Sequence, residues 1–141
     1  MTRRAALALI AGASRAQTTK STGEEAARLV LDASRALQAR RAGRFLGYFE
    51  KSETPEFARF RENVLALSAT REIASSVRIE KVAVEEEAVR LQVDWLLQLT
   101  PLEQPGAVEH RQALVEILVR GKKIASFSAP DGFLAPPRVS P

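Results

Sequence analysis

The stretch "LQVDWLLQL", Leu91–Leu99, alternates apolar and polar residues with a period of two. That period predicts a β-strand, because successive side chains of a strand point to opposite faces of the sheet. Val93 and Trp95 then fall on the more continuously apolar face, and Asp94 falls on the other. We therefore expect the Trp95 face to line the core, and Asp94 is the residue whose role has to be explained.

The same alternation extends through the second half of the chain and predicts four strands joined by short connections. The predicted strands are separated by an acidic turn, a loop with two prolines and a Gly-Lys turn. The predicted strands cover residues 77–84, 88–100, 108–120 and 123–128.

The first half of the chain has helical periodicity instead. We predict an amphipathic helix over residues 24–41 that Gly43 ends, and a short helix or turn over "RFLGYF" at residues 44–49. A second long helix is predicted from Thr54 to Thr70, because threonine is a good cap and proline suits the first helical position.

Helices followed by antiparallel strands define an α+β domain, with N-terminal helices packed on one face of a curved, mostly antiparallel four-stranded sheet. We place this single domain at residues 24–136, after a linker at residues 17–23 and before a tail at residues 137–141. Phe133 and Leu134 are expected to tuck against the domain.

Residues 1–16, "MTRRAALALIAGASRA", have the pattern of a signal peptide: a basic start, an apolar run and small residues near the end. The apolar run is too short to span a bilayer, so no stable membrane anchor is expected. We expect a periplasmic or secreted protein whose mature chain begins at Gln17. The alternative is a cytoplasmic protein with a frayed N-terminus.

The composition limits the chemistry. The chain has no cysteine and one histidine, so a conventional metal site is not expected. Residues 1–16 hold three of the 21 basic residues and no acid, which leaves the remainder close to neutral. Two short basic runs, residues 39–44 and 120–123, remain. Nucleic-acid binding needs a concentrated basic face and is disfavoured. No cofactor is expected.

Three segments, "FARFRENVLALSAT", "SSVRIEKVAVEEEAVRLQVDWLLQL" and "SFSAPDGFLAPP", resemble the nuclear transport factor 2-like superfamily, and more narrowly its exported bacterial members. The resemblance covers residues 24–136. It implies a cone-shaped fold with a pocket between sheet and helices, often dimeric through the outer face of the sheet. The superfamily holds isomerases, cyclases and dehydratases as well as binding and assembly domains, so the fold does not assign a function.

Asp94 has two interpretations. On the outer face it would pair with a basic residue of a neighbouring strand, such as Arg111. In the opposite register it would line the pocket as a general base whose pKa is raised by burial. We favour the outer face.

Three further residues are candidates for a site. Trp95 is a core residue or a wall of a ligand pocket. Tyr48 is a ring at the open end of the sheet or a hydrogen-bond donor into a pocket. His110 is an exposed strand residue or the only group that titrates near neutral pH without help.

These observations favour an exported, non-enzymatic domain that binds a small apolar ligand or a protein partner. Because both faces of the predicted third strand carry apolar residues, we expect a homodimer. The alternative is a cofactor-independent isomerase, cyclase or dehydratase that uses Asp94, Tyr48 or His110. Whether the protein is an enzyme stays open at this point.

Overall fold

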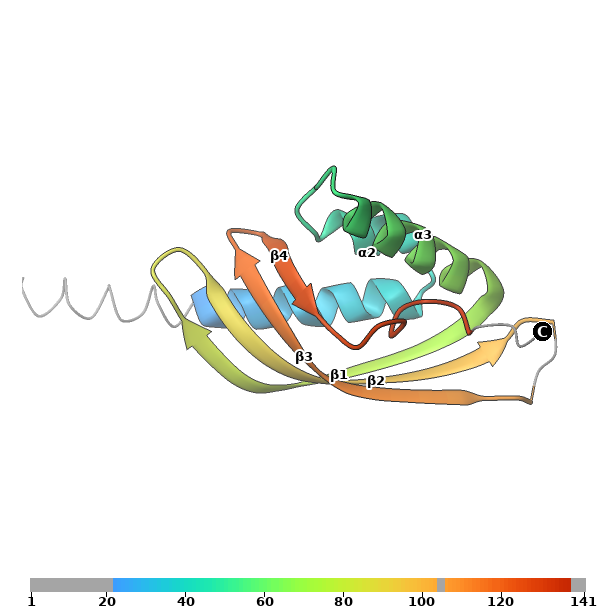
Figure 1. The fold of residues 1–141 in the computed structure, drawn as a ribbon. Helices are drawn as coiled ribbons and strands as arrows, with labels where there is room; N and C mark the ends of the chain where they lie inside the picture. The colour runs from blue at the N-terminus through green and yellow to red at the C-terminus, as the bar shows by residue number, and fades with distance from the viewer. Residues whose placement is uncertain (1–21, 104–105, 138–141) are drawn as a thin grey trace, which may run out of the picture.

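The computed structural model describes residues 22–103 and 106–137, and it confirms the predicted α+β class. Helices come first and four strands follow (Figure 1). The elements are an N-terminal helix over residues 22–38, α2 (Ala42–Gly47), α3 (Pro55–Thr70), β1 (Arg71–Val84), β2 (Val89–Pro101), β3 (Glu109–Arg120) and β4 (Lys123–Ser128).

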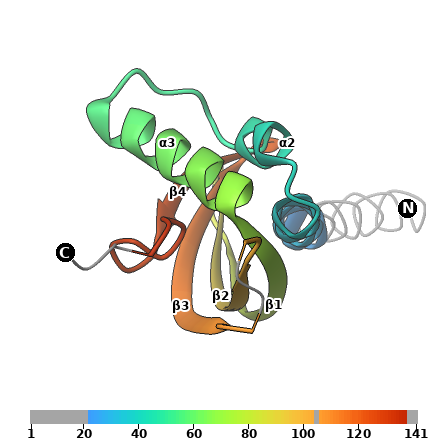
Figure 2. The same ribbon diagram turned by 90° about the vertical axis from the view of Figure 1, so that its right-hand side faces the viewer.

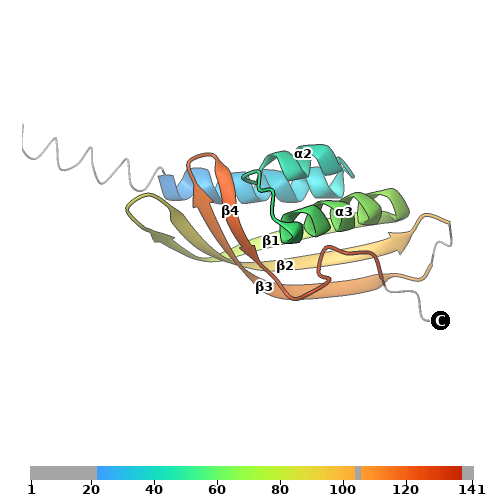
Figure 3. The ribbon, with the colours of Figure 1, turned by 45° about the horizontal axis from the view of Figure 1, so that its top comes forward.

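The strands form one antiparallel sheet in the order β1-β2-β3-β4, so each strand pairs with its neighbours in sequence. The sheet is curved, and the helices lie on its concave side (Figures 2 and 3). Four strands were predicted. The last three agree with the prediction to within one residue at each end.

The first strand begins at Arg71, six residues before the predicted start, because α3 passes directly into it. Arg71 already has an extended backbone, with φ −133° and ψ 144°. The start of α3 matches the prediction. Pro55 is the first residue of the helix, and the Thr54 hydroxyl accepts a hydrogen bond from the Phe57 amide at 3.2 Å.

The predicted end of the first helix was wrong. The helix stops at residue 38, and Gly43 lies inside α2 instead of breaking the chain. The reversal is made by Arg40, whose φ of 59° lies in the left-handed region. Its guanidinium Nε donates to the carbonyl of Ser68 at 2.8 Å, which ties the turn to the end of α3.

The concave face of the sheet carries the core. Alternate residues of β2 from Val89 to Leu99 are buried, as the alternation of the sequence predicted. They pack against apolar residues of the three helices. A chain of aromatic rings, with centroids 5.1–6.4 Å apart, fills the space between α2, α3 and β4: Phe45, Phe49, Phe57, Phe60, Trp95 and Phe127.

The predicted leader, residues 1–16, and residues 17–21 of the predicted linker lie outside the described part of the chain. Residues 22 and 23, which the prediction also placed in the linker, belong to the N-terminal helix. Within residues 22–103 and 106–137, no helix has the length and apolar character needed to cross a membrane.

Candidate functional site

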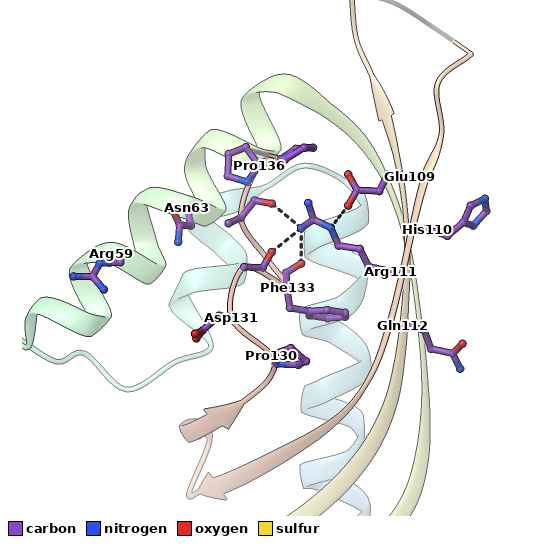
Figure 4. Close-up of a pocket in the computed structure, with 13 residues that line it drawn as sticks. Arg59, Asn63, Glu109, His110, Arg111, Gln112, Pro130, Asp131, Phe133 and Pro136 are labelled. Carbon is purple, nitrogen blue, oxygen red and sulfur yellow. Dashed lines mark hydrogen bonds and ion pairs between the residues drawn. The ribbon is translucent and has the colours of Figure 1, made fainter. Parts of the chain in front are cut away.

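After β4 the chain crosses the open end of the sheet as an irregular segment, which we call the C-terminal strap (residues 129–137). The strap runs between α3 and the first part of β3 (Figure 4). It borders an open groove of about 970 Å³, which we call the strap groove. The groove is lined by Arg59, Asn63, Glu109, His110, Arg111, Gln112 and residues of the strap.

Arg111 holds the strap in place (Figure 4). Its side chain is on the concave face of β3 and is only 13% exposed. Its Nη1 donates to the carbonyls of Gly132 at 2.8 Å, Phe133 at 2.9 Å and Ala135 at 2.6 Å. Its Nε donates to the Glu109 carboxylate at 2.6 Å. A planar guanidinium with several fixed donors suits this arrangement better than a lysine ammonium does.

The strap has its own local structure. The Phe133 amide donates to the Pro130 carbonyl and the Ala135 amide to the Gly132 carbonyl, both at 3.1 Å, so the strap consists of two successive turns. Gly132 has a φ of 80°, which favours glycine at that position. Phe133 and Leu134 are buried, as the sequence predicted. The strap therefore closes one end of the core.

The far wall of the strap groove is α3. Arg59 is exposed and Asn63 is half-buried, and both line the groove, as does the exposed Asp131 of the strap. A smaller adjoining compartment of about 240 Å³ has an apolar floor that includes Phe60, Phe127 and Leu134. Polar groups above an apolar floor are typical of binding sites for small molecules and peptides.

Around Trp95, the space between sheet and helices, where the resemblance implies a pocket, is occupied by buried side chains of the described residues. Trp95 is fully buried, and its Nε1 donates to the Ser75 hydroxyl at 2.9 Å. The Ser75 hydroxyl is also hydrogen-bonded to the Ser34 hydroxyl, at 2.7 Å. This chain of three polar groups satisfies the indole inside the core. Trp95 is thus a core residue joined to both the N-terminal helix and β1.

Asp94 lies on the outer face of the sheet, the placement that the sequence favoured. Its carboxylate accepts hydrogen bonds from Gln112 Nε2 at 3.1 and 3.2 Å and lies 3.8 Å from the Arg78 guanidinium. The prediction that Arg111 is the partner of Asp94 was wrong, because Arg111 lies on the concave face. Hydrogen bonding to Glu80, and then the charges of Glu80 and Asp94, raise the pKa of Arg78 above its ordinary value.

The other two candidates lie on separate surfaces. His110 borders the strap groove, but its side chain projects to the outer side of β3 in Figure 4. Tyr48 follows α2 and lines a different groove, together with Arg41 and Arg44. The structure therefore does not bring Asp94, Tyr48 and His110 together. Within the described residues, no group of three His, Asp or Glu side chains is placed to hold a metal ion.

Of the residues that line the strap groove, the sequence singled out His110 as a site candidate, and it did not single out the others. One signal pointed to Arg111: it lies in phase with Ala113, Val115 and Ile117, so strand alternation places its charge on the apolar face. A charged residue in that position needs partners nearby.

Comparison with known protein families and with curated proteins finds no match to this chain. The helices packed on a four-stranded antiparallel sheet are compatible with the nuclear transport factor 2-like fold that the sequence resembles.

Proposed function

We propose that the protein is a non-enzymatic binding domain of the nuclear transport factor 2-like type, and that it holds a small molecule or a short peptide in the strap groove. The observation that carries this proposal is the filled interior around Trp95, beside an open groove with exposed polar groups. A ligand can reach the strap groove without displacing the core.

The proposal is preferred to the isomerase, cyclase or dehydratase alternative because of where the candidate residues lie. A general base has to be within hydrogen-bonding reach of its substrate, beside the groups that stabilise the developing charge. Asp94 is engaged by Gln112 and Arg78 on the outer face, while Tyr48 lines a groove on another side of the fold.

Binding in the strap groove can be tested by nuclear magnetic resonance with a library of small fragments and short peptides. We expect binders to shift the amide signals of Arg59, Asn63 and Asp131. Replacing Asn63 with tryptophan should narrow the groove beside α3 and weaken these shifts, whereas Glu62→Trp, on the exposed side of α3, should preserve them. Shifts confined to the interior around Ser75 would instead favour an enclosed pocket and an enzyme.

We further propose that two copies pair through the outer face of the sheet. Leu114 is 55% exposed there and Leu96 is 38% exposed. The charged residues around them are already paired within the chain, because Arg78 contacts Asp94 and Arg90 contacts Glu116 at 3.1 Å. Covering this face would therefore bury few unpaired charges.

Replacing Leu114 with lysine is expected to convert a dimer into a monomer at micromolar concentration, as measured by sedimentation velocity. Lysine would sit directly across from Asp94 within one chain, so the fold should tolerate it, while two copies would repel each other. Leu65→Lys, on the exposed side of α3, is the matched control and should stay dimeric. A monomeric unsubstituted protein would contradict the proposed pairing.

Export is the last part of the proposal, and it rests on the pattern of residues 1–16. The intact mass of protein recovered from a bacterial periplasm tests it directly. Cleavage after Ala16 would leave a chain that begins at Gln17, and a full-length mass in the cytoplasm would exclude this route.

A further inference from the structure

One residue of the second basic run contacts the short helix that follows the start of the first, although 76 positions separate the two residues in sequence. The first run contains Arg41 and Arg44, on either side of the start of α2. The second contains Lys123, the first residue of β4. The Lys123 ammonium donates to the carbonyl of Gly47 at 2.5 Å, at the last residue of α2. Lys123 therefore lies at the end of α2, whereas Arg41 precedes this helix and Arg44 lies within it.

A groove of about 320 Å³ lies between the N-terminal helix and α2. Its volume is at the lower end of the range of about 300–1,000 Å³ that ligand pockets occupy. Three guanidinium groups and one carboxylate line it, with a tyrosine and two alanines. The lining residues are Asp32, Arg35, Ala36, Ala39, Arg41, Arg44 and Tyr48. The groove shares no residue with the strap groove.

The turn at Arg40 assembles this arrangement. Arg40 takes the left-handed conformation, and the following amide, that of Arg41, donates to the carbonyl of Ala36 at 2.9 Å. The chain thus folds back and brings α2 beside the last turns of the N-terminal helix. The guanidinium of Arg40 does not line the groove, because it donates a hydrogen bond to the carbonyl of Ser68. Its neighbours in the first basic run, Arg41 and Arg44, line the groove.

The charges in the groove are not balanced within the chain. Among the described residues, no carboxylate pairs with Arg41 or Arg44, and none hydrogen-bonds to the hydroxyl of Tyr48. Arg35 has one loose ion pair, 3.7 Å from Asp32. The groove therefore carries a net charge of about two positive units, because arginine stays protonated at every physiological pH.

We propose that this groove binds the phosphate group of a ligand, held by Arg41 and Arg44 and supported by Arg35 and the Tyr48 hydroxyl. Arginine offers paired donors that match phosphate oxygens, and a doubly charged anion would balance the excess charge. A free phosphate monoester and the terminal phosphate of phosphatidic acid share this chemistry.

The test is a titration of the full chain with inorganic phosphate at constant ionic strength, followed through the arginine Nε–H signals in nuclear magnetic resonance spectra. We expect saturable shifts of Arg35, Arg41 and Arg44. The double variant Arg41→Gln/Arg44→Gln should weaken binding at least about tenfold, because it removes two charge-assisted contacts. Both side chains are exposed, so the variant should fold normally.

The matched control is Arg28→Gln/Arg61→Gln, which removes the same charge from exposed positions outside the grooves described above. It should bind phosphate as the unsubstituted protein does. A second arm measures co-sedimentation with phosphatidic acid and phosphatidylglycerol vesicles, because only phosphatidic acid carries a phosphate monoester. Binding to the phosphatidic acid vesicles alone, lost only in the Arg41/Arg44 variant, would identify a lipid phosphate as the source.

Two results would overturn the proposal. One is the absence of saturable shifts together with the absence of vesicle binding. The other is an equal loss of binding in the Arg41/Arg44 variant and in the control, because that would show attraction to net charge and not to a built groove. Neither result bears on ligand binding in the strap groove.

Discussion

Replacing Trp95 with alanine is expected to lower the free energy of unfolding by about 3–5 kcal/mol, as is usual when a large aromatic residue is removed from a core. The expectation rests on complete burial and on the edge contact with Phe127, whose ring centroid is 5.7 Å away. Domains of this size are stable by only about 5–15 kcal/mol. The loss would therefore be visible as a large shift of the urea midpoint, followed by circular dichroism.

Two further variants show how much of this loss of stability comes from the hydrogen bond of Trp95 and how much any exposed substitution causes. Trp95→Phe keeps a ring but removes the hydrogen bond to Ser75, so we expect a loss of about 1–3 kcal/mol. Leu65→Ala, at an exposed position of α3, should change stability by less than about 1 kcal/mol. A small effect of Trp95→Ala would contradict the filled interior and reopen the case for an enclosed pocket.

Replacing Arg111 with methionine is expected to cost about 2–4 kcal/mol and to release the strap, because three strap carbonyls lose their charged donor. Hydrogen exchange monitors the release directly. The amides of Phe133 and Ala135, which are hydrogen-bonded within the strap, should exchange much faster in the variant.

Two variants test the part that the Arg111 guanidinium plays. Arg111→Lys keeps the positive charge, but its side chain is one bond shorter and its ammonium falls short of the three carbonyls that Nη1 contacts, so strap exchange should also accelerate. Glu109→Gln removes only the partner of Nε and should leave strap exchange close to that of the unsubstituted protein. Unchanged exchange in Arg111→Met would show that burial of Phe133 and Leu134 alone retains the strap.

The parts of the fold that local chemistry dictates were predictable. Thr54 and Pro55 define the start of α3, and the alternation in β2 defines both the strand and the face that Trp95 occupies. The start of β1 was missed because Ser75, which is on the concave face, interrupts the apolar alternation. Its hydroxyl is satisfied by Trp95 and Ser34, two partners that are distant in sequence.

The sites were harder to predict because each depends on contacts between distant segments. Arg111 meets the strap more than twenty residues later, and the groove beside α2 depends on the unusual conformation of Arg40. Nothing in the local sequence requires an arginine to take a left-handed backbone conformation. The fold class could thus be predicted from pattern, whereas the grooves follow from tertiary packing.

The contact between the N-terminal helix and β1 has a consequence for aggregation. In a sheet that does not close, the first strand has an unpaired edge on which another chain can template a strand. Here the side chain of Gln38 accepts the outward amide of Ser75 at 3.0 Å, which occupies part of that edge. Farther along, the register shift between Ile79 and Lys81 distorts the strand beside a lysine. Both features obstruct edge-to-edge stacking along this strand of 14 residues.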